Sequence, residues 1–167
     1  MKKIHRVLAS VVLLAAAGVA SAQLAPKDFY AEAGLLELQL EGATTTRKPL
    51  LGRFIVGKDI DKNLSIEGLV ALNLRKDADM SATTYGVFLK PKMEVAKDVD
   101  VFARLGVAHT ESKVNAGTYS STKAAYGLGI QTLLTKTIYT QIDFMHYGKD
   151  DQGNNASGFA FSAGYRF

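Results

Sequence analysis

Two histidines and two nearby carboxylates are the residues whose types could support hydrolytic or metal chemistry. His109 and His146 are separated by 36 positions of chain, and Asp150 and Asp151 follow the second histidine. Nucleophilic hydrolysis needs a serine beside a histidine base and an acidic residue that orients the base. The spacing of these four residues matches no such set and no zinc ligand set. We therefore expect no catalytic residue, metal or cofactor, and interpret both histidines as polar rim residues.

Most other charged residues recur on one face of segments whose opposite face is apolar. This period of two is typical of β-strands, and a helical period of 3.6 is almost absent. Each segment has about 10 to 14 residues, and a tilted strand needs about 9 to 11 to cross a bilayer. The eight predicted segments are Asp28–Leu40, Lys48–Gly57, Asn63–Leu74, Ala82–Val95, Val99–Thr110, Thr122–Leu134, Thr137–Gly148 and Ala156–Phe167.

The parity of each segment separates an apolar surface from a charged one. Leu64, Ile66 and Val70 share one face of their segment, for example, and Glu67 lies on the other. Apolar residues outside and charge inside invert the soluble β-protein pattern, so the outer surface is expected to meet lipid. A one-residue slip would place an arginine in lipid at about 2–4 kcal/mol near the midplane. The expected interior charge network comprises Arg53, Glu67, Lys90, Lys92, Glu94, Arg104, Lys123, Asp143 and Arg166, with Gln141 on the same face.

The first segment does not fit a single parity. Glu32 and Glu37 cannot both face inward on a regular strand, and a bulge near Gly34 would reconcile them. With one of these glutamates added, the interior charges nearly balance. Because buried charges need partners, we expect ion pairs that plug the interior. A narrow pore with a preference for anions is the alternative.

The connections between segments fall into two kinds. Short turns follow the second, fourth and sixth segments, whereas longer polar loops follow the others. Together with the even strand count, this predicts an all-β, eight-stranded antiparallel up-and-down transmembrane β-barrel with both termini on the periplasmic side. The final strand ends on an aromatic residue and is expected to close the barrel against the first; an edge strand of a soluble sandwich is the alternative. The expected outer loops are Glu41–Arg47, Arg75–Ser81, Glu111–Ser121 and Lys149–Asn155.

The amino-terminal residues have the pattern of a secretory signal peptide. A basic start precedes an uncharged run from Val7 to Val19, and Ala20-Ser21-Ala22 offers a cleavage site before Gln23. We predict a signal peptide at residues 1–22 and a barrel domain at residues 23–167; a retained anchor helix is the alternative. Residues 1–22 hold three of the 20 Lys and Arg and none of the 16 Asp and Glu, so their removal lowers the formal charge from +4 to +1. Nucleic-acid binding is therefore not expected.

These features, with Gly164-Tyr165-Arg166-Phe167 at the end, resemble the small outer-membrane β-barrel family of Gram-negative bacteria, of the porin-opacity and OmpA-like type. The resemblance implies an outer-membrane location, with the barrel assembly machinery and periplasmic chaperones as partners. It also implies that Phe161, Ala163, Tyr165 and Phe167 form the barrel-assembly signal. Some barrels of this size deacylate lipid A, but neither mature histidine has the serine two positions on that the deacylase pattern requires.

Three functions remain open at this stage. The first is a structural or surface-interaction barrel with a plugged interior, and we expect it to be a monomer in contact with outer-membrane lipid and lipopolysaccharide. The second is a small-solute channel, and the third is a lipid A-modifying enzyme. A soluble lipocalin-type barrel would need an apolar interior. The sequence names no surface ligand.

Overall fold

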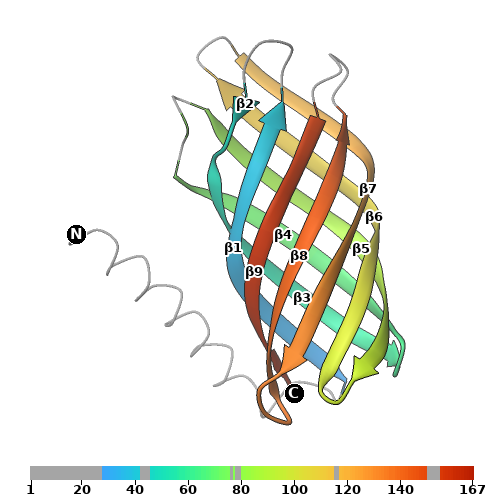
Figure 1. The fold of residues 1–167 in the computed structure, drawn as a ribbon. Coiled ribbons are helices and arrows are strands. Elements are labelled where there is room, and N and C mark those ends of the chain that lie inside the picture. The colour runs from blue at the N-terminus through green and yellow to red at the C-terminus, as the bar shows by residue number, and fades with distance from the viewer. Residues whose placement is uncertain (1–27, 42–45, 76, 78–79, 115–116, 150–154) are drawn as a thin grey trace, which may run out of the picture.

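The chain forms a closed antiparallel barrel of eight long strands (Figure 1). The computed structural model describes residues 28–41, 46–75, 77, 80–114, 117–149 and 155–167. The predicted signal peptide and its cleavage site at Ala20, Ala22 and Gln23 lie outside these residues and stay a prediction. The strands are β1 (Phe29–Glu41), β3 (Leu50–Asp61), β4 (Leu64–Arg75), β5 (Ser81–Ala96), β6 (Val99–Val114), β7 (Gly117–Leu133), β8 (Ile138–Lys149) and β9 (Asn155–Arg166), with the two-residue β2 (Thr46–Arg47) paired to β1.

Each long strand pairs with its neighbours in sequence, and β9 pairs with β1 to close the sheet. The backbone N–H of Phe167 continues this seam by donating to the carbonyl of Phe29 at 2.9 Å. The start of β1 and the C-terminus lie at the same end of the barrel (Figure 1). The predicted fold class and the predicted pairing of the last strand with the first are therefore confirmed.

Two local predictions are wrong. No bulge interrupts β1 near Gly34, because its register with both β3 and β9 is continuous there. Glu32 is buried and Glu37 is exposed on the outer face, so only the first belongs to the interior. The expected loop Glu111–Ser121 is mostly strand, because β6 and β7 stay paired as far as Val114 and Gly117.

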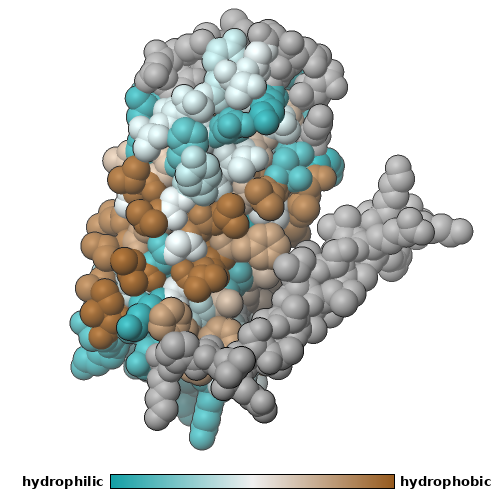
Figure 2. Space-filling model, turned by 180° about the vertical axis from the view of Figure 1, so that it is seen from behind, coloured by the Kyte–Doolittle hydropathy of each residue, from teal (hydrophilic) through white to brown (hydrophobic). Residues whose placement is uncertain are grey.

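An apolar belt surrounds the outside of the barrel. Figure 2 shows it on one face, with more polar residues above and below it. Large apolar side chains of the predicted outward parity are exposed, including Val87 at 63% and Leu128 at 71%. No helix among the described residues is long and apolar enough to cross a membrane.

The inside of the barrel contains two chemically different layers. On β1, β4 and β8, which run away from the end that holds the C-terminus, a buried acidic residue precedes the residues of the apolar layer. Glu67, for instance, precedes Leu69 on β4. The apolar layer consists of Leu36, Leu38, Leu51, Ile55, Leu69, Ala71, Ala82, Phe88, Ala108, Ala125, Met145, Tyr147 and Ala160.

Candidate functional site: the barrel interior

Three cations and three anions lie together inside the barrel, and we call them the charge layer. All six side chains are at least 98% buried, although their strands lie far apart in sequence. Inward parity places them there, since each occupies the face opposite the lipid-facing residues of its strand. The charge layer is Glu32, Arg53, Glu67, Lys90, Arg104 and Asp143.

Arg53 and Asp143 form a two-pronged ion pair across the barrel. Arg53 Nη1 donates to Asp143 Oδ2 at 2.7 Å, and Nη2 donates to Oδ1 at 2.6 Å. The same Nη2 also donates to the Ser162 hydroxyl at 2.7 Å. This planar geometry suits a guanidinium and fixes both side chains, as bidentate arginine–carboxylate pairs do. The pair ties β3 to β8 and β9.

Arg104 is the cation with the most carboxylate partners in the charge layer. Its Nε donates to Glu67 Oε2, its Nη2 lies 3.3 Å from Glu32 Oε2, and its Nη1 lies 3.0 Å from Asp143 Oδ1. Arg104 is 0% exposed. One buried guanidinium therefore joins all three carboxylates of the layer.

The ammonium group of Lys90 lies between two carboxylates and two amides. Its Nζ is 3.3 Å from Glu32 Oε1 and 3.2 Å from Glu67 Oε1, and it donates to the Oε1 atoms of Gln131 and Gln141 at 3.3 and 3.1 Å. The ring of Phe102 adds a cation–π contact, with Nζ 4.4 Å from the centroid. A desolvated ammonium is stable here because oxygen atoms and rings replace its water.

Two tyrosines donate further hydrogen bonds to the carboxylates of the charge layer. Tyr30 donates its hydroxyl to Glu67 Oε1 at 2.7 Å, and Tyr139 donates to Glu32 Oε1 at 2.8 Å. Sequence reasoning did not assign these two tyrosines to the interior network. The signal was present, because Tyr30 shares the parity of Glu32 on β1, and Tyr139 that of Asp143 on β8.

The other predicted network residues lie nearer the two ends of the barrel. Lys92 pairs with Asp59 at 2.6 Å, and the Arg166 guanidinium lies over the Tyr139 ring at 5.3 Å. Lys123 is half-buried on β7, beyond the apolar layer. Glu94 is exposed near the end of β5, so the prediction that it joins the interior network is wrong. Its parity was correct, but it lies past the closed part of the barrel.

The apolar layer was not predicted. Leu36, Leu38 and Leu51 are 0% exposed, as is Met145. The expectation of a charged interior is therefore correct for one half of the barrel and wrong for the other. A sequence signal existed, because pairs such as Leu35–Leu36 and Leu50–Leu51 make both faces of a strand apolar at the same level.

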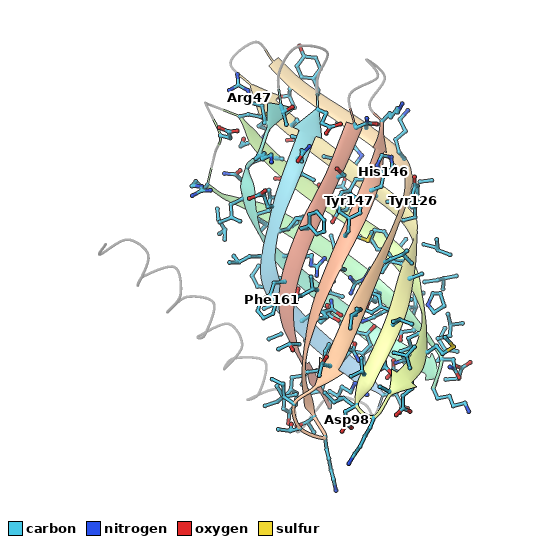
Figure 3. All side chains as sticks on the ribbon, in the orientation of Figure 1. Arg47, Asp98, Tyr126, His146, Tyr147 and Phe161 are labelled. Atoms are coloured by element: carbon cyan, nitrogen blue, oxygen red, sulfur yellow. The ribbon has the colours of Figure 1, made fainter. Side chains whose placement is uncertain are left out.

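Both histidines face outward rather than into the barrel. The His109 ring packs on Tyr85 at 4.9 Å between centroids, and its Nδ1 lies 2.7 Å from Thr122 Oγ1. His146 packs on Tyr126 at 5.1 Å, and Figure 3 shows these two side chains beside each other on the barrel wall. Among the described residues, no three His, Asp or Glu side chains gather into a metal-binding group.

A closed barrel with an apolar belt outside and ion pairs inside defines the class of integral membrane β-barrels. Residues 7–167 match the model of the outer membrane protein β-barrel domain family, so the chain belongs to that family. The resemblance to small outer-membrane barrels is thereby confirmed. No curated protein sequence matches the chain significantly.

Solved structures with the same fold come from several bacteria. Neisserial surface protein A has a TM-score of 0.66 at 14% identity, covering 84% of this chain and 98% of that one. Ail, the attachment invasion locus protein of Yersinia pestis, has a TM-score of 0.63 at 18% identity, covering 85% and 100%. The N-terminal β-barrel domain of Pseudomonas aeruginosa OprF has a TM-score of 0.64 at 12% identity, covering 84% and 98%. At these identities, the similarity shows the fold alone.

Proposed function

We propose that this protein is an outer-membrane barrel that is closed to solutes and acts as a structural or surface-interaction component of the cell envelope. The observation that carries the proposal is that two layers of buried side chains fill the interior. The charge layer fills one half of the barrel and the apolar layer fills the other, and both are almost fully buried. Small eight-stranded barrels have an interior that side chains can fill.

Planar-bilayer recording tests the closure directly. We expect the refolded protein to insert without discrete conductance steps, under conditions in which a channel-forming porin conducts. Recurrent unitary steps would contradict closure and would favour the small-solute channel. Heat-modifiable gel migration of the same sample verifies that the barrel is folded.

The proposed surface role needs the loop ends of the barrel to face outward. The chain has no cysteine, so single cysteines can report on topology. Lys113, with a side chain 63% exposed, lies near the tip of the β6–β7 hairpin, and Lys97 lies in the exposed turn at the opposite end. We expect an impermeant maleimide to label Lys113→Cys on intact cells and Lys97→Cys only after permeabilisation. The reverse pattern would contradict the orientation.

The names of the similar structures are in keeping with a surface role. One is called a surface protein and another an attachment invasion locus protein. The outer ends of β6 and β7 provide a polar surface for such a role, with Thr118, Tyr119 and Ser120 exposed. We propose lipopolysaccharide and membrane lipid as the immediate partners of the monomer, because the apolar belt must be covered by lipid.

We also propose that the protein is not an enzyme. His109 packs on Tyr85 and lies 2.7 Å from Thr122 Oγ1, and His146 packs on Tyr126 and pairs with Ser157 on β9. Among the described residues, these contacts assemble no triad of serine, histidine and carboxylate. Unchanged lipid A masses after overexpression are the expected result. A new deacylated or acylated species that depends on either histidine would contradict this assignment.

A further inference from the structure

A groove of about 660 Å³ crosses the outer face of the barrel from β3 to β7. It follows two adjacent cross-strand rows of outward-facing residues. One row is Val56, Gly68, Val87 and Val107, and the other is Phe54, Val70, Tyr85, His109 and Thr122. Because this surface lies in the apolar belt, whatever occupies the groove meets it from the lipid side.

The two ends of the groove differ in polarity. The β3 and β4 end is formed by Phe54, Val56 and Val70, whereas the β6 and β7 end carries His109 and Thr122. The imidazole is held by the contact of its Nδ1 with the threonine hydroxyl and by the Tyr85 ring. When Nδ1 accepts from that hydroxyl, Nε2 carries the proton and is free to donate to an anion.

His109 marks the boundary between apolar and polar outer surface. On β6, the outward residues before it are Leu105 and Val107, both exposed, and those after it are Glu111 and Lys113. This change occurs toward the loop end of the strand, where an outward-facing membrane surface has its headgroups. The groove therefore has an apolar body inside the membrane and a hydrogen-bonding end at headgroup level.

We infer that this groove binds one acyl chain of lipid A from the outer leaflet, with a phosphate of the same molecule bound at His109. The inference rests on the proposed outer-membrane orientation. An acyl chain fits the valine-lined rows, and the imidazole Nε2–H of His109, with the Tyr85 side chain packed on the ring, suits a phosphate oxygen. Lys113 and Glu111 follow on the same face of β6 and form an ion pair at 3.0 Å, so they mark the polar side of the boundary without adding net charge.

Gly68 and His146 make the inference testable with matched variants. A Cβ built at Gly68 meets nothing closer than 4.0 Å, so a leucine there would fill the groove without a clash at its root. His146 repeats the cross-strand pairing with a tyrosine, yet neither His146 nor Tyr126 is among the described residues that line this groove. It is therefore a histidine of the same type without the proposed site.

Native mass spectrometry of the folded barrel, released from detergent micelles with added lipid A, measures the bound lipid. We expect wild type to retain one lipid A and Gly68→Leu to lose it. His109→Gln should bind roughly tenfold more weakly, as expected for the loss of one charge-assisted hydrogen bond. His146→Gln should bind as wild type does. So should Ala103→Leu, which fills a separate groove on the outer face that Ala103, Leu128 and Ile142 line.

Dephosphorylated lipid A distinguishes binding of the phosphate from binding of the acyl chain. With it, His109→Gln should bind as wild type does, while Gly68→Leu should still bind less. Equal retention of lipid A by all variants, or equal losses for His109→Gln and His146→Gln, would overturn the inference. Each variant is first checked for heat-modifiable migration, so failure of the barrel itself is distinguished from failure of the lipid site.

Discussion

Replacing Arg104 with methionine should strongly destabilise the folded barrel. Arg104 is fully buried, and all three carboxylates of the charge layer lie within 3.3 Å of its guanidinium nitrogens. The layer holds three cations and three anions, so the substitution leaves one uncompensated negative charge in a buried site. Removing one partner of a buried pair costs about 3–5 kcal/mol, roughly a hundredfold to several-thousandfold in the folding equilibrium.

The partner substitution Glu67→Gln gives a sharper form of this prediction. In the double variant with Arg104→Met, the layer returns to two cations and two anions. The double variant should therefore be less destabilised than the sum of the two single variants, with a coupling of about 0.5–3 kcal/mol. The Gln side chain still accepts from Tyr30, so the shape of the site is largely kept.

Equilibrium urea unfolding in lipid vesicles measures these free energies. The chain has no tryptophan, so far-ultraviolet circular dichroism and unheated gel migration report on folding in its place. A loss of under about 1 kcal/mol for Arg104→Met would refute the argument that this cation neutralises buried carboxylates. Strict additivity in the double variant would refute the coupling.

Three further changes test other parts of the barrel. Met145→Ala in the apolar layer should lower the unfolding free energy by about 2–5 kcal/mol without opening a conductance, measured by urea unfolding and bilayer recording. Gly164→Ala should lower the unfolding free energy by about 1–3 kcal/mol, because the new Cβ would lie 2.2 Å from the Tyr139 ring. Its control is Gly68→Ala, which meets open space and should be nearly neutral in the same urea unfolding assay. Phe167→Ser should slow assembly of the barrel in cells, measured by pulse-chase gel migration, and leave its refolding in detergent nearly unchanged. Equal slowing in cells and in detergent would argue against an assembly signal.

The alternation of the sequence could predict which side of the wall each residue occupies. Period two fixes the face of Arg53, Glu67 and Asp143 without knowledge of their partners, and lipid penalises a slip. Parity carries no information about height along the barrel axis, however. Glu94 has the correct parity but lies past Pro91, where β5 no longer pairs with β4. Glu37 faces outward at the level of Leu50, where β3 begins at the loop end.

The β6–β7 hairpin shows where composition misleads. Its outer residues are rich in serine, threonine and glycine, which is typical of loops. Outside a membrane, strands no longer need an apolar face, and threonine and tyrosine favour extended backbone. Pairing along Thr110–Val114 and Gly117–Ser121 therefore continues the sheet, although no apolar alternation marks it.

The two interior layers reinforce each other. Ion pairs such as Arg53–Asp143 are strong only where water is excluded. The apolar layer lies between these pairs and the loop end, and it keeps water on that side away from them. The charge layer in turn holds strands from opposite sides of the barrel together, which keeps Leu36, Leu51 and Phe88 packed. A solute path would have to break a balanced set of buried charges and also hydrate a close-packed apolar layer. Because both costs fall on the same event, the two layers together support the proposed closure, and a closed barrel would meet its partners through its outer surface and loop end.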